Sequence, residues 1–277
     1  MLFPKIPLGE YVAVAVDWAQ INLDALFSVI TSVIEFVVTG IQIILSMAHP
    51  LLLTAIVFAL VWFISRKTAV GTVVGLLLIY NLELWEPAVE TLSLVLAATI
   101  LALLAGIPMG ILSARSDLVN RVVAPVLDFM QTMPPFVYLI PAVLFFGLGQ
   151  VPGLIATVVF AMPPSIRLTA LGIRQVPLDL VEAADAFGST EWQKLVKVQL
   201  PLALPTIMAG INQSIMLSLS MVVISAMIGA GGLGSEVLAG ISRLDIAKGF
   251  EGGLAIVVIA IILDRITQGL TKKRSEY

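Results

Sequence analysis

Long apolar blocks separated by short polar connections constrain this chain more than any other feature of its sequence. Several blocks approach the roughly 20 apolar residues that an α-helix needs to cross a bilayer. Hydrophobic residues make up 59% of the 277 residues, and the mean hydropathy is +1.07. Soluble domains are about half apolar and about one quarter charged, whereas here only 12% of residues are charged. The sequence therefore predicts a polytopic, all-α membrane protein.

Seven blocks are predicted to span the membrane. In chain order they are Pro50–Ile64, Thr68–Leu82, Val89–Leu112, residues 122–148, residues 151–166, Thr206–Ile228 and Gly253–Ile266. Two Met-Pro-Pro sequences, which contain Pro134-Pro135 and Pro163-Pro164, are interpreted as helix breaks near the cytoplasmic ends of adjacent spans. Gly106, Pro108 and Gly110 predict a kink or a close helix contact late in the third span.

Residues 22–48 have a polar stripe at helical spacing and apolar residues largely opposite it. The stripe consists of Ser28, Thr31, Ser32, Glu35, Thr39, Gln42 and Ser46. Two interpretations are open: an amphipathic helix that lies along the membrane, or an additional span with its polar stripe packed inward. The first is favoured, because only His49-Pro50 separates this segment from the next apolar block.

Positive charges predict the orientation. Seven spans with a cytoplasmic C-terminus place twelve basic residues inside and leave only Lys5, Arg243 and Lys248 outside. The chain is therefore expected in the cytoplasmic (inner) membrane of a bacterium or archaeon. The first twenty residues lack the pattern of a cleavable signal.

A charged island, Glu182–Pro201, stands between two hydrophobic stretches. It predicts two short helices with a break between them. Asp179 is expected to cap the first, with Glu182 completing a capping box, and Gly188 to end it in the left-handed conformation. Ser189 or Thr190 would begin the second helix with Gln193 as its box partner. Pro201 would stop this second helix.

The same island resembles the EAA motif of ABC importer permeases. The matching residues are Glu182, Ala183, Ala184, Gly188, Val198, Leu200 and Pro201, with Val198 at a position where the family usually has Ile. The resemblance implies a coupling helix, with surrounding segment 179–201, that docks on a separate ATPase subunit.

A glycine-rich loop, residues 229–237 (GAGGLGSEV), follows the sixth predicted span. Gly229, Gly231 and Gly234 spell GxGxxG, but a dinucleotide site requires a surrounding βαβ unit, and a membrane helix precedes this loop. The loop resembles a segment of osmoprotectant and methionine-type permeases. Together with Gly232, these glycines predict a re-entrant outer gate, the alternative being a floppy external loop.

Catalytic patterns are not evident in the sequence. The chain has one histidine, His49, for which a structural role is expected, and it has no cysteine. It also lacks the Gly-rich ATP-binding motif with Lys and Ser/Thr, and its net charge of −3 argues against nucleic acid as a partner. Asp128 is expected to form a structural pair with an arginine, Arg121 being near in sequence, and Glu83, Glu86 and Glu90 to form a solvated outer end.

Residues 131–177 resemble glycine betaine/proline betaine permeases, and the likeness covers most of residues 85–265. It implies about seven spans of the MetI-like type I importer fold plus an N-terminal amphipathic helix. Implied partners are an ABC ATPase dimer that holds ATP and Mg²⁺, a separate extracytoplasmic binding protein and a second copy of the chain; no cofactor is expected on the chain itself. The expected organisation is a surface segment and amphipathic helix (1–49), two accessory spans (50–84), the permease core (85–270) and a cytoplasmic tail (271–277).

These observations predict a non-catalytic permease subunit that imports quaternary-ammonium osmoprotectants. The alternative is an ABC importer permease of the same architecture that transports an amino acid or another small solute. An ATP-independent channel or secondary transporter is a third possibility, but it predicts inverted repeats and buried carboxylate relays that the sequence lacks. No substrate-binding residue is predicted.

Overall fold

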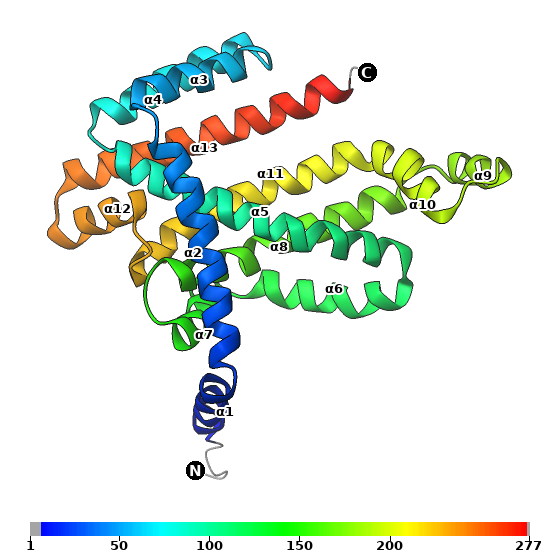
Figure 1. Ribbon diagram of the computed structural model, residues 1–277, viewed down its shortest axis with the longest axis horizontal. Coiled ribbons are helices and arrows are strands. Elements are labelled where there is room, and N and C mark those ends of the chain that lie inside the picture. The colour runs from blue at the N-terminus through cyan, green and yellow to red at the C-terminus, as the bar shows by residue number, and fades with distance from the viewer. Residues whose placement is uncertain (1–6, 276–277) are drawn as a thin grey trace.

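The computed structural model describes residues 7–275, which form helices and connecting turns without a strand (Figure 1). The α-helices are α1 (Leu8–Asn22), α2 (Asp24–Ser46), α3 (Pro50–Trp62), α4 (Arg66–Asn81), α5 (Trp85–Arg115), α6 (Asp117–Thr132), α7 (Pro135–Phe146), α8 (Gln150–Arg174), α9 (Leu178–Ala186), α10 (Glu191–Lys194), α11 (Leu200–Ser225), α12 (Gly232–Arg243) and α13 (Ile246–Ser275), with a π-helical turn, η1 (Leu195–Gln199), and a 3₁₀ turn, η2 (Ala226–Ile228). The expected all-α class is confirmed. Residues 1–6, including Lys5, and residues 276–277 of the expected tail lie outside the described part.

Three long helices, α5, α8 and α11, pack against one another at the centre of the molecule (Figure 1). Small residues allow their backbones to approach. A Cβ atom on Gly110 of α5 would lie 2.6 Å from the Thr169 Cβ and 2.7 Å from the Ile166 carbonyl oxygen of α8. Such small-residue contacts are a main means of helix association in a membrane. The close helix contact predicted around Gly110 is therefore present.

The prediction that Pro163 and Pro164 end a helix is wrong. Both lie inside α8, which continues to Arg174, and both are buried. The Pro164 carbonyl faces α11, where a Cβ on Gly210 would lie 3.1 Å from its oxygen. Prolines are tolerated inside membrane helices when neighbouring helices support the weakened backbone, and close packing provides that support here.

The other proline pair does mark a break. Pro134 precedes α7 and Pro135 occupies its first turn, where a missing backbone N–H costs nothing. The axes of α6 and α7 meet at 100°, which corresponds to a broken span or a re-entrant segment.

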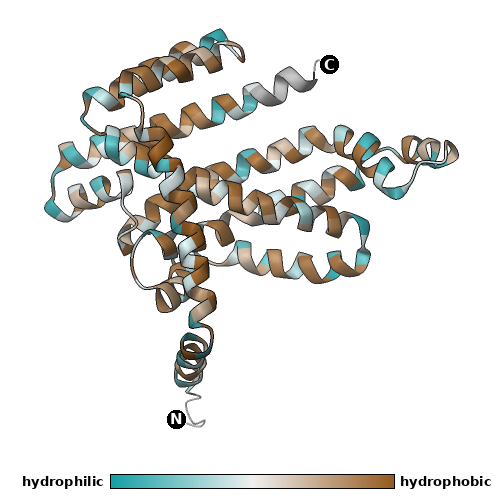
Figure 2. Cartoon of the chain, in the orientation of Figure 1, coloured by the Kyte–Doolittle hydropathy of each residue, from teal (hydrophilic) through white to brown (hydrophobic). Residues whose placement is uncertain are grey.

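Within the described residues, five helical stretches are long and apolar enough to cross a membrane, or six if α6–α7 counts as one bent span. Figure 2 shows hydrophobic residues along the long helices and hydrophilic residues gathered at the connections. Five of the seven predicted spans correspond to α5, α6–α7, α8, α11 and α13. The other two, α3 and α4, contain only 13 and 16 residues, fewer than the roughly 20 that cross a bilayer.

The segment with the polar stripe forms α2, which is itself one of the five long apolar helices. It packs on α5 through the buried side chains of Ile34 and Val38 and crosses the long helices at a steep angle (Figure 1). Within the stripe, the Ser28 and Ser32 hydroxyls donate to the carbonyls of Ala25 and Ser28. Whether α2 lies along the membrane or crosses it stays a prediction.

Candidate functional site

The charged island forms a helical hairpin at one end of α8 and α11 (Figure 1). Gly188 ends α9 with φ +76°, and its N–H donates to the Asp185 carbonyl at 2.9 Å. The next N–H, of Ser189, donates to the Ala184 carbonyl at 3.0 Å. These two bonds form a Schellman motif, which requires a left-handed residue that glycine adopts without strain. The predicted role of Gly188 in the turn is present.

Of the two capping boxes predicted for the hairpin, the one at the start of α10 is present and the one at the start of α9 is absent. Thr190 and Gln193 form the expected capping box: the Gln193 N–H donates to Thr190 Oγ1 at 3.3 Å and the Thr190 N–H to Gln193 Oε1 at 2.9 Å. The box predicted for Asp179 and Glu182 is absent, because α9 begins at Leu178 after Pro177. Proline fixes its own φ and favours a chain that enters a helix directly after it, which moves the start of α9 ahead of Asp179.

A nearly buried lysine holds the hairpin together. Lys194 Nζ lies 2.8 Å from Asp185 Oδ1 on α9 and 2.9 Å from Glu191 Oε1 on α10, and its side chain is 11% exposed. Arg115, at the end of α5, contacts the other Glu191 oxygen at 3.1 Å. The hairpin lies outside the apolar part of α11. Within the hairpin, a hydrogen bond from Lys194 is the main reason that the pKa of Glu191 is lowered. The hydrogen bond to Asp185 is in turn the main reason that the pKa of Lys194 is raised.

The outer surface of the hairpin is apolar as well as charged. Phe187 is 91% exposed and Trp192 is 68% exposed. Glu182 and Ala183 are also exposed, whereas Ala184 is buried. Large aromatic side chains on a surface mark interaction sites when they occur together. Neither aromatic was predicted as a site residue from the sequence, although their positions in the charged island could have indicated them.

Pro201 does not stop the second helix as predicted. Val198 lies in the π turn η1, in which the Leu200 N–H donates to the Leu195 carbonyl five residues earlier. Leu200 and Pro201 then begin α11, so helical structure runs from Glu191 to Ile228. The wider π turn changes the hydrogen-bond register immediately before Pro201, so the helix passes a residue that has no N–H to donate.

The glycine-rich loop occupies the opposite end of α11. Gly229, Gly231 and Gly232 have φ values of +86°, +87° and +71°. Gly234 lies in the first turn of α12, where a Cβ would approach the Val223 carbonyl oxygen to 2.7 Å. Helices flank the loop on both sides, whereas a dinucleotide fingerprint follows a strand in a βαβ unit.

Two residues of α5, Glu90 and Thr91, bind this loop through hydrogen bonds that were not predicted from the sequence. Glu90 Oε2 accepts the Gly232 N–H at 2.7 Å, and Glu90 Oε1 accepts from Gln150 Nε2 at 2.7 Å. Thr91 Oγ1 accepts the Leu233 N–H at 2.8 Å, and Leu233 is fully buried. These hydrogen bonds hold the loop against α5, so it is not the loosely held external loop of the alternative interpretation. The prediction that Glu90 belongs to a solvated outer end is wrong, because both of its oxygens accept hydrogen bonds from the protein.

Arginines of α8 bind α6 and α5. Arg167 pairs with Asp128, and Arg174 lies 2.8 Å from Asp117 Oδ1 and donates to the Ser113 carbonyl at 2.9 Å. Asp128 thus has an arginine partner, but this partner is Arg167 on the adjacent helix rather than Arg121. These pairs connect the cytoplasm-facing turns predicted from the sequence to the helix that leads into the hairpin.

The described residues contain no cluster of His, Asp and Glu suited to a metal ion. His49 has a structural position before α3, where its Nδ1 accepts the Leu51 N–H at 3.4 Å.

The chain is similar in sequence to several known proteins. The sequence profile of the family described as "Binding-protein-dependent transport system inner membrane component" matches residues 106–276. The chain is 52% identical over 272 residues to the glycine betaine transport system permease protein OpuAB of Bacillus subtilis (strain 168), covering 98% of this chain and 96% of that protein. It is 53% identical over 276 residues to the glycine betaine/carnitine transport permease protein GbuB of Listeria monocytogenes serotype 1/2a (strain 10403S), covering 98% and 97%.

The glycine betaine/proline betaine transport system permease protein ProW of Escherichia coli (strain K12) is 48% identical over 268 residues, covering 96% of this chain and 75% of ProW. Among solved structures, a chain from the inward-facing MetNI methionine ABC transporter gives a TM-score of 0.63 at 20% identity, covering 69% of this chain and 95% of that chain. At this identity the likeness concerns the fold, and it confirms the expected MetI-like architecture.

Proposed function

Because the chain belongs to the family of binding-protein-dependent transport system inner membrane components, we propose that it is the permease subunit of an ATP-driven importer of glycine betaine and related quaternary-ammonium osmoprotectants. The observation that carries this proposal is the 48–53% identity to three betaine permeases over at least 96% of the chain. As a transport permease component, the chain is a non-catalytic, multi-pass membrane protein.

The charged hairpin is the proposed coupling element. Its exposed Phe187 and Trp192 offer an apolar contact surface for an ATPase subunit, and Glu182 offers a charge beside it. The ion pairs of Lys194 and Arg115 connect this surface to α9, α10 and α5. A displacement of the ATPase would therefore be transmitted directly to the central helices. ATP and Mg²⁺ belong to that partner, which forms a dimer beneath two copies of this chain.

The glycine-rich loop is the proposed outer gate. It lies at the opposite end of α11 from the hairpin and is held by Glu90 and Thr91. In this proposal the ATPase dimer closes on ATP, the hairpins move with it, and the spans change from inward-facing to outward-facing. A binding protein outside the inner membrane delivers the solute. The hairpin and the C-terminus are cytoplasmic, in line with the distribution of positive charges.

The deciding experiment measures ATP-dependent uptake of glycine betaine into liposomes that contain the chain with its ATPase and binding-protein partners. Gly188→Ala strains a left-handed turn by about 1–2 kcal/mol, and we expect roughly tenfold slower uptake. Glu182→Ala is expected to weaken coupling in the same direction. Gly40→Ala is the matched control, because its methyl group enters open space on a helix.

Each outcome separates a different part of the proposal. ATPase activity that the binding protein stimulates, without betaine uptake, would keep the importer and discard the cargo, and carnitine, proline betaine and amino acids would be tested next. Equal uptake by Gly188→Ala and Gly40→Ala would show that the turn at Gly188 does not contribute to coupling with the ATPase. Flux through the chain alone, without ATP, would overturn the proposal.

A further inference from the structure

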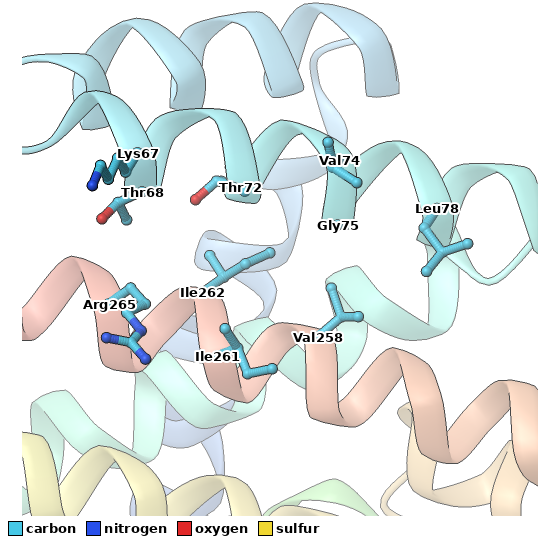
Figure 3. Close-up of a pocket in the computed structure, with 11 residues that line it drawn as sticks. Lys67, Thr68, Thr72, Val74, Gly75, Leu78, Val258, Ile261, Ile262 and Arg265 are labelled. Atoms are coloured by element: carbon cyan, nitrogen blue, oxygen red, sulfur yellow. The ribbon is translucent and has the colours of Figure 1, made fainter.

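A cavity of about 500 Å³ lies between α4 and α13 (Figures 1 and 3). α13 contacts α4 at Gly75 and the turn before α4 at Ile64. A Cβ on Gly75 would lie 2.6 Å from Val258 Cγ1, and one on Gly269 would collide with Ile64. Between these contacts a Cβ on Gly71 would meet nothing within 4 Å. The helices therefore line a partly open space that protein atoms leave empty.

The cavity has a cationic end and an apolar end. Figure 3 shows Lys67 and Thr68 of α4 above Arg265 of α13, and farther along the cavity Val258 and Leu78. Within the described residues, neither Lys67 nor Arg265 has an acidic partner within ion-pair distance. The nearest acid along α13, Asp264, is bonded to Asn212 and Gln268. Two cations thus face the same space without a counter-charge from the part of the chain that the structure describes.

Thr72 lies in the wall of the cavity. It is 2% exposed, lines the cavity, and its hydroxyl has no hydrogen-bond partner among the described residues. Thr91 and Thr157, buried in other helices, each donate to a carbonyl four residues earlier, whereas the buried Thr169 and Ser214 hydroxyls also have no partner among the described residues. An unsatisfied buried hydroxyl costs about 1–3 kcal/mol, and this one lies beneath the cavity surface rather than open to it.

We propose that this cavity binds one anionic phospholipid of the cytoplasmic leaflet. Its phosphate lies between Lys67 and Arg265 within reach of the Thr68 hydroxyl, and an acyl chain lies along Leu78, Val258 and Ile261. Basic pockets between membrane helices on the cytoplasmic side suit anionic headgroups. The apolar continuation requires a lipid rather than a free phosphate ion. The lipid would join the short pair α3–α4 to the core through α13. The leaflet rests on the orientation given under the proposed function.

The test counts lipids on the purified full-length chain by native mass spectrometry. Phosphatidylglycerol is compared with phosphatidylethanolamine of the same acyl chains, because the choline of phosphatidylcholine resembles the proposed cargo. We expect the wild type to bind one phosphatidylglycerol with a clear preference. Lys67→Gln with Arg265→Gln should reduce this preference roughly 10- to 30-fold, since each cation near a membrane surface contributes about a factor of five.

Two further variants make the test specific. Gly71→Leu keeps both charges but fills the cavity, and it should weaken phosphatidylglycerol binding to a similar extent. Arg66→Gln with Arg121→Gln removes two exposed cations outside the cavity and should leave the preference unchanged. Circular dichroism and monodisperse elution check that each variant folds.

A wild type without preference, or a preference that survives in either cavity variant, would overturn the proposal. Complete displacement of the lipid by inorganic phosphate would identify a free-anion site instead and would also overturn it. The measurement uses no ATP, cargo or partner protein. A failure of the lipid site is therefore distinguishable from a failure of the import function.

Discussion

Glu90 joins distant parts of the chain with both of its carboxylate oxygens: one accepts from Gly232, 142 residues away, and the other from Gln150, 60 residues away. It accepts the Gly232 N–H at the start of α12, where a negative charge is also favoured by the helix dipole. Gly231 has no alternative in this geometry, because a Cβ there would collide with the Glu90 carboxylate. The Glu90 carboxylate thus occupies the space that a side chain at position 231 would need.

Glu90→Ala should loosen the glycine-rich loop, because the Gly232 N–H loses a charged acceptor worth about 1–3 kcal/mol. We expect amide hydrogen exchange in residues 229–236 to accelerate roughly 10- to 100-fold. Glu86→Ala is the matched control, an exposed acid on the first turn of the same helix. Equal exchange in the two variants would show that Glu90 does not hold the loop.

Conservative substitutions at Glu90 distinguish the effect of losing its hydrogen-bond acceptor from the effect of losing its negative charge. Glu90→Gln can still accept from Gly232 and can donate to Gln150 if that amide turns over. Its effect should therefore be much smaller than that of alanine, and Glu90→Gln combined with Gln150→Glu should restore slow exchange.

Local rules succeeded where the bonding partners are close in sequence. Gly188 and the Thr190–Gln193 box depend on residues at most four positions away, so the sequence alone predicts them. The partners of Glu90 and Asp128 are 142 and 39 residues away, and no local pattern identifies them. Pairing across such distances is decided by which helices pack together.

The hairpin of α9 and α10 behaves as a unit because Lys194 is shared between its two helices. Lys194→Met should free α9 from α10 while leaving α5, α8 and α11 packed. The ion pairs are partly exposed, so we expect a local cost of only about 1 kcal/mol. Limited proteolysis near residues 186–190 should accelerate, whereas the thermal midpoint of the membrane core should change little.

Lys197→Met is the control for this change, since Lys197 is an exposed lysine in the adjacent π turn and has no acidic partner within the described residues. Lys194→Arg should retain most of the protection. If the two methionine variants are cleaved at the same rate, the shared lysine does not unite the hairpin.

Proline rules failed for two helices for one reason. Pro163 and Pro201 each lack the donor that a regular helix uses. Burial between α5 and α11 supports the first, and the π turn before α11 accommodates the second. A rule applied to isolated helices overestimates the cost of proline inside a bundle, where packing maintains the helix on both sides of it.

The arrangement of the whole chain in the membrane depends on α2. Its 23 residues extend about 35 Å, enough to cross a bilayer, yet it crosses α5 at a steep angle (Figure 1). Because α5 is itself a long spanning helix, a steep crossing favours a position along the membrane plane. The two arrangements differ in one observable: the side of the membrane on which α2 begins.

The chain has no cysteine, so a single introduced cysteine is an unambiguous probe of that side. Met47→Cys, after α2, and Asp24→Cys, at its start, should both react with an impermeant maleimide added outside intact cells, because a helix lying along the outer face keeps both ends there. Phe187→Cys on the exposed hairpin should react only after the membrane is permeabilised. Reaction of Met47→Cys from outside and of Asp24→Cys only after permeabilisation would instead establish α2 as a span, and with it a cytoplasmic N-terminus.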